Sequence, residues 1–103
     1  MHMATISDRV FSVINDLEQG ETLEAKLTCL AEYEVRRRLA RYQLADRLFT
    51  RKYSMSLEQF ETQEMVKKFG YSFDAESDHQ DWDLAADGIQ TMQRRLNDLR
   101  GSQ

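Results

Sequence analysis

Seven basic side chains lie close together in the middle of this 103-residue chain, which has a formal net charge of −4. Segment 36–52 holds these seven cations and one acidic residue, so its net charge is 7 − 1 = +6. Such a block could contact phosphates, with a steep salt dependence. It could also pair with Glu32, Glu34 and the acidic segments on either side. Pairing is the favoured interpretation, because no helix-turn-helix, ribbon or finger pattern surrounds the block. The block consists of Arg36, Arg37, Arg38, Arg41, Arg47, Arg51 and Lys52.

An acidic stretch follows at 74–87, and its spacing invites a comparison with a calcium-binding loop. Asp74, Glu76 and Asp78 occupy what would be positions 1, 3 and 5 of such a loop. Position 6 would then be His79 instead of glycine, and position 12 would be Ala85 instead of glutamate. We therefore expect no metal site. The stretch is either a solvated helix start, favoured by the helix dipole, or an anionic surface that fits a cationic pocket on another protein.

Catalytic chemistry is not indicated anywhere in the chain. Cys29 is the lone cysteine and has no C-x-x-C partner, so we expect a packed thiol and a reducing, cytoplasmic environment. His79 has no neighbouring nucleophile, and no glycine-rich phosphate loop is present. No apolar run approaches the roughly 18 residues of a membrane span. The chain is therefore predicted not to be an enzyme, and to have no catalytic residue, metal or cofactor.

Aromatic residues beside the acidic stretch are candidate anchors for a protein partner. Such residues are enriched at the centres of interfaces, although each could equally pack in the core. Gly88 falls inside a predicted helix, where glycine costs about 1 kcal/mol relative to alanine. Close approach of another helix, or of another chain, would explain it. The predicted partner-binding residues are Tyr71, Phe73, Asp78, Asp81, Trp82, Gly88 and Ile89.

The elements that must position these side chains are all predicted to be helices. Apolar residues make up 41% of the chain and charged residues 31%, with no proline and four glycines. Apolar side chains recur every three or four residues, which is typical of amphipathic helices. We expect a single all-α domain over 1–103, in which Met1 to Met3 are either native residues or a cloning remnant. Its four helices are predicted at 6–19, 22–53, 57–69 and 78–100.

Local signals set three of the predicted boundaries. The S-x-x-Q pattern at 56–59 is a capping box that starts the third helix, and Gly70 can close it in the left-handed conformation. A second S-x-x-Q pattern at 77–80 predicts the start of the last helix. The connector 71–73 is then expected to be extended or irregular.

The second predicted helix is too long for a compact domain of this size. Its 32 residues would extend about 48 Å at 1.5 Å per residue. A compact 100-residue domain has a radius of gyration of about 13 Å. We therefore expect another chain to cover this helix, either in a homodimer or in a complex with a different protein.

The segment from about 39 to 99 resembles small helical bacterial proteins that are encoded beside TumE-type toxins, the TumA-like antitoxins. The resemblance rests on RKYSMSLEQFE, VKKFGYSFDAESDHQDWDLAADGIQTM and QRRLNDL, while residues 1–20 have no counterpart. It implies a cytoplasmic antitoxin of a type II pair, which neutralises a cognate toxin by direct binding, and RNA cleavage is one candidate activity of that toxin. The alternatives are a nucleic-acid-binding protein that uses the arginine block and an oligomeric scaffold.

Overall fold

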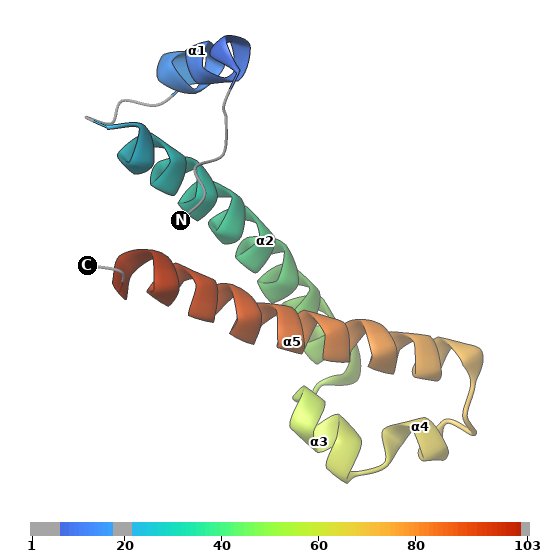
Figure 1. The fold of residues 1–103 in the computed structure, drawn as a ribbon. Coiled ribbons are helices and arrows are strands. Elements are labelled where there is room, and N and C mark those ends of the chain that lie inside the picture. Colours follow the sequence, from blue (N-terminus) through green and yellow to red (C-terminus); the bar gives the residue numbers. More distant parts are fainter. Residues whose placement is uncertain (1–6, 18–21, 102–103) are drawn as a thin grey trace.

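The computed structural model describes residues 7–17 and 22–101, in which every regular element is an α-helix (Figure 1). The all-α prediction is confirmed, although the chain has five helices there instead of four. Their bounds are α1 Asp8–Leu17, α2 Leu23–Tyr53, α3 Leu57–Thr62, α4 Met65–Lys68 and α5 Phe73–Gly101.

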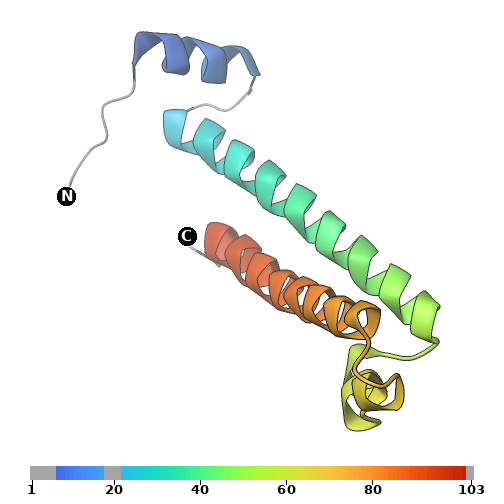
Figure 2. The same ribbon diagram turned by 90° about the vertical axis from the view of Figure 1, so that its right-hand side faces the viewer.

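The two long helices α2 and α5 form an antiparallel hairpin, and the short helices α3 and α4 connect them at one end (Figures 1 and 2). At the other end, Arg100 Nη2 lies 3.4 Å from Glu32 Oε1. The Cα radius of gyration is 19.5 Å and the longest dimension is 57 Å. The chain is thus far more extended than the ~13 Å expected for a compact domain of this length.

An aromatic cluster at the connected end forms the centre of the core. The Trp82 ring stacks on Phe49 and Tyr53 at centroid distances of 5.6 and 5.9 Å. Phe60 from α3 lies 4.8 Å from Tyr53 and 5.3 Å from Trp82. Eleven large apolar side chains of the described residues are exposed, so the hairpin leaves much apolar surface uncovered. The buried apolar residues are Ile14, Phe60, Ala75, Trp82, Ala85 and Leu96.

The predicted helix at 57–69 is interrupted, and the interruption has a packing cause. Its capping box is confirmed: Gln59 N–H donates to Ser56 Oγ, and Ser56 N–H donates to the Gln59 side chain. Glu64 is left-handed, with φ 51°, and separates α3 from α4. In one continuous helix, at about 100° per residue, Met65 would point about 140° away from Phe60. The break lets both side chains line the same hollow.

The last helix begins five residues before the predicted start at 78, so the second capping box was wrong. Ser72 caps α5 instead, since its Oγ accepts from Ala75 N–H at 3.2 Å and its carbonyl accepts from Glu76 N–H at 3.0 Å. Ser77 lies inside the helix. The early start brings Ala75 into the helix, where it is buried in the core.

Helix α1 lies beside the start of α2 (Figure 1). Ser7 Oγ accepts from Val10 N–H at 3.2 Å, Ile14 is buried, and Asn15 Oδ1 accepts from Lys26 Nζ. The predicted helix ends at 6 and 19, and Met1 to Met3, lie outside the described residues.

Candidate partner-binding surface

Three exposed aromatic side chains project from the connection between α4 and α5, and we call Phe69, Tyr71 and Phe73 the aromatic turn. The exposed fraction is 60% for Tyr71 and 83% for Phe73. Two of these residues were predicted partner contacts. The prediction missed Phe69, which the alternation of aromatic residues at 69, 71 and 73 could have revealed.

Backbone hydrogen bonds fix the conformation of the aromatic turn. Tyr71 N–H donates to Val66 O and Gly70 N–H donates to Lys67 O, both at 2.9 Å, which is the Schellman pattern. The predicted left-handed closure at Gly70 is confirmed, with φ 68°. Tyr71 follows at φ 55°, a conformation that is uncommon for a non-glycine residue. The chain thus holds an exposed tyrosine in an unfavourable backbone conformation, and such outliers cluster at functional sites.

A hollow of about 490 Å³ lies beside the aromatic turn, between α3, α4 and α5. Its apolar lining includes Phe60, Met65 and Val66, with Tyr71 at the turn. Carboxylates from α3, from the break between α3 and α4 and from α5 complete it together with one imidazole, and we call this the acidic hollow. The polar lining residues are Glu61, Glu64, Glu76, His79 and Gln80.

The composition of the acidic hollow fits a long cationic side chain. The aliphatic stem of a lysine or arginine could lie on the apolar lining while its charge meets the carboxylates. His79 is fixed within the hollow, because its ring stacks on Phe60 at 5.8 Å and its Nε2 lies 2.8 Å from Glu61 Oε2. Sequence reasoning missed Glu61 on α3 and Glu64 at the break between α3 and α4, since both precede the aromatic turn whereas the acidic stretch follows it.

Asp78, another predicted partner contact, is already engaged within the chain. Its Oδ2 accepts from Lys52 Nζ and from Tyr53 Oη, both at 2.5 Å. Partial burial favours the neutral acid, but these two hydrogen bonds outweigh it and hold the Asp78 pKa below its ordinary value. Asp78 therefore ties α5 to the end of α2 instead of facing a partner.

This linkage predicts an acid-dependent loss of stability. The pKa of Asp78 is lower in the folded chain than in the unfolded chain, so the unfolded chain binds the proton more readily. Ionised Asp78 therefore stabilises the fold fully above its ordinary pKa of about 3.9. It is lost as the pH falls through the lower, folded-state pKa. In urea unfolding at about pH 7 and about pH 3, Asp78→Asn should show a smaller decrease in unfolding free energy than the wild type. Equal decreases in both proteins would contradict this role of Asp78.

The remaining predicted contacts lie in or beside the interface between α2 and α5. Trp82 is 0% exposed, and its Nε1 donates to Asp46 Oδ1 at 2.8 Å. Ile89 is partly buried. A Cβ built on Gly88 would lie 2.5 Å from two ring atoms of Tyr42, so the close approach inferred for this glycine occurs within the chain. Only Asp81 of this group is exposed.

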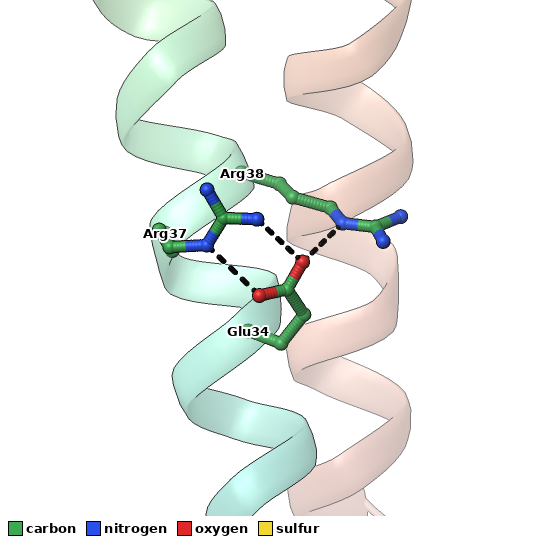
Figure 3. Close-up of polar contacts among 3 residues, drawn as sticks. All are labelled: Glu34, Arg37 and Arg38. Atoms are coloured by element: carbon green, nitrogen blue, oxygen red, sulfur yellow. Dashed lines mark hydrogen bonds and ion pairs between the residues drawn. The ribbon is translucent and has the colours of Figure 1, made fainter.

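Intrachain ion pairs engage four members of the basic block. Arg36 bonds Glu32 at 2.8 Å, and Lys52 bonds Asp78. Arg37 and Arg38 both bond Glu34, at 2.9 and 2.6 Å (Figure 3). These two hydrogen-bonded guanidinium groups lower the pKa of Glu34 to about 2. The exposed side chains of Arg41, Arg47 and Arg51 form no ion pair with a described residue.

Cys29 is exposed, so the expectation of a packed thiol was wrong. Its position explains the difference. Arg100, one residue before the end of α5, lies opposite Glu32, so α5 does not accompany the part of α2 that precedes this contact. Over 7–17 and 22–101, no group of three or more His, Cys, Asp or Glu side chains could hold a metal ion.

These features define an all-α helical hairpin with an exposed aromatic turn beside an acidic hollow. No protein-family model, curated protein or solved structure matches the chain. Within the described residues, no helix combines the length and apolar character that crossing a membrane requires.

Proposed function

We propose that this chain is an antitoxin-like protein that binds and neutralises a cognate toxin, and that it acts by binding and not by catalysis. The observation that carries the proposal is the aromatic turn, which exposes three aromatic side chains and contributes one of them, Tyr71, to the lining of the acidic hollow. The resemblance to TumA-like antitoxins supports the same role. A cytoplasmic location follows from that role as part of the proposal.

The chemistry of this surface suits a basic partner. Aromatic side chains supply most of the energy at many interfaces, while complementary charge accelerates encounter. An RNA-cleaving toxin would carry a cationic groove for its substrate. The carboxylates of Glu61, Glu64 and Glu76 could neutralise such a groove, and the aromatic turn could hold the complex.

A binding experiment tests this directly with the protein encoded in the adjacent reading frame. Phe73→Ala should weaken its complex with that protein at least about tenfold, measured by titration calorimetry, because the change removes an interface anchor. Tyr33→Ala is the matched control, since Tyr33 is 75% exposed on α2, outside the aromatic turn. We expect the control to bind like the wild type.

Two results would count against the proposal. One is the absence of a complex with the neighbouring protein, and the other is an equal loss of affinity for Phe73→Ala and Tyr33→Ala. In cells, co-expression of the chain should restore growth that the neighbouring protein inhibits.

A second candidate function, nucleic-acid binding, rests on Arg41, Arg47 and Arg51, whose side chains form no ion pair with any residue that the structure describes. A gel-shift titration at two salt concentrations separates the two functions. Retardation that disappears at the higher salt would favour nucleic acid, because released counterions make phosphate contacts salt-sensitive. The ion pairs of the other four basic residues make this function the less favoured one.

A further inference from the structure

We infer that one groove between α2 and α5 is the interface of a two-fold homodimer. The groove has a volume of about 450 Å³ and lies outside the aromatic turn and the acidic hollow. Its α5 wall is formed by Asp81, Leu84 and Ala85, and its α2 wall by Arg37, Arg38, Arg41, Tyr42 and Ala45. The inference does not depend on the proposed binding of a toxin.

The groove carries apolar surface that the single chain leaves uncovered. Leu84 is 64% exposed, and the small Ala45 and Ala85 side chains lie in the same groove. Leu44 and Leu48 are also exposed. They follow Arg41 and Ala45 by three residues, a spacing that makes them neighbours on the helix surface. A continuous apolar strip therefore extends from Leu84 onto α2, as expected for a protein interface.

Charge selects a second copy of the chain as the occupant. Arg37 and Arg38 on the α2 wall both pair with Glu34, whereas Arg41 on that wall and Asp81 on the α5 wall form no ion pair with a described residue. A partner with charge of a single sign would satisfy one wall and repel the other. In a two-fold dimer each patch meets an identical patch, so Arg41 of each copy can face Asp81 of the other. The two Leu84 side chains then lie near the symmetry axis.

The first test places a charge in the apolar part of the groove. Light scattering coupled to size-exclusion chromatography should show a concentration-dependent dimer for the wild type. Leu84→Asp should raise the dimer dissociation constant at least about tenfold, because it buries two unpaired carboxylates near the axis. Phe73→Ala, in the aromatic turn, is the control and should leave this constant unchanged. It should weaken only the complex with the neighbouring protein, so the failure of either proposal can be recognised separately.

A charge exchange tests the symmetry itself. Arg41→Asp and Asp81→Arg should each weaken the dimer severalfold, because each variant places like charges opposite one another at both contacts. The double variant Arg41→Asp/Asp81→Arg should restore the affinity, since the opposite charges face each other again with the walls exchanged. Circular dichroism checks that every variant keeps its helix content.

Three outcomes would overturn the inference. The first is a wild-type protein that stays monomeric at about 1 mM. The second is a Leu84→Asp dimer as tight as the wild type. The third is a double variant no tighter than the two single variants. If Leu84→Asp loses its helices, Leu48→Asp provides the same test at an exposed position of α2.

Discussion

Replacing Trp82 by alanine should lower the free energy of unfolding by about 3–5 kcal/mol, the usual cost of removing a large buried aromatic side chain. Trp82 is fully buried, and Phe49, Tyr53 and Phe60 pack around its ring. Its loss would leave a cavity at the connected end of the hairpin and deprive Asp46 of its hydrogen bond. Small domains are stable by about 5–15 kcal/mol, so the variant should unfold at much lower urea concentration than the wild type.

The measurement is urea unfolding followed by far-ultraviolet circular dichroism. Trp82→Phe is the informative control, because it keeps an aromatic ring in the cluster and removes the Nε1 donor to Asp46. We expect it to lose about 1 kcal/mol, because the partly buried Asp46 carboxylate loses one hydrogen bond but can still be reached by water. A Trp82→Ala protein that unfolds like the wild type would contradict the central place of this residue in the core.

Introducing a branched side chain at Gly88 should destabilise the chain by about 1–3 kcal/mol. A Cβ at this position would already lie 2.5 Å from the Cδ2 and Cε2 atoms of the Tyr42 ring and 2.7 Å from its Cγ. Gly88→Val adds two further methyl groups there. The Tyr42 ring would have to leave its place between the helices, and α2 would move away from α5. Thermal unfolding monitored by circular dichroism measures the effect.

A second background separates this clash from helix propensity. Gly88→Ala in a Tyr42→Ala chain should be stabilising by about 0.5–1 kcal/mol, because the obstacle is gone and alanine favours the helix over glycine. In the wild-type chain, the clash with Tyr42 should offset the gain in helix propensity, so that Gly88→Ala no longer stabilises the fold. If Gly88→Ala stabilises both backgrounds equally, the contact with Tyr42 does not explain the glycine.

Much of the helical architecture could be predicted, because it depends on local patterns. The three- and four-residue apolar spacing, the absence of proline and the capping box at Ser56 all act within a few residues of the backbone they shape. The break at Glu64 could not be predicted in this way. No glycine or proline lies at the break. We attribute the break to packing, because it allows Phe60 and Met65 to line the same hollow. The second S-x-x-Q pattern predicted the wrong start of α5 for the same reason, namely packing between helices. Ala75 is buried, and α5 begins before the pattern so as to include it.

The site was predicted only where exposure follows from the local sequence. Tyr71 and Phe73 lie at the tight turn before α5 and are exposed. Trp82 also stands beside acidic residues in the sequence, which made it an equally good candidate for a partner contact, but it is fully buried. The difference arises from Phe49, Tyr53 and Phe60, which other helices bring to the tryptophan. The periodicity of apolar residues along α5 cannot show which aromatic residues of other helices will pack against Trp82. The acidic hollow was missed because its carboxylates are contributed by segments on both sides of the aromatic turn.

The two ends of the α2–α5 hairpin are held by forces of very different strength. Stacked rings and the buried Trp82–Asp46 hydrogen bond clamp the connected end. Beyond the buried Leu96, the opposite end is joined by the exposed Arg100–Glu32 pair, and such pairs contribute at most about 1 kcal/mol. Mechanical compliance is therefore concentrated at the far tips of the helices. The tips can separate or approach by small adjustments there, while the aromatic turn at the rigid end keeps the shape that recognition requires.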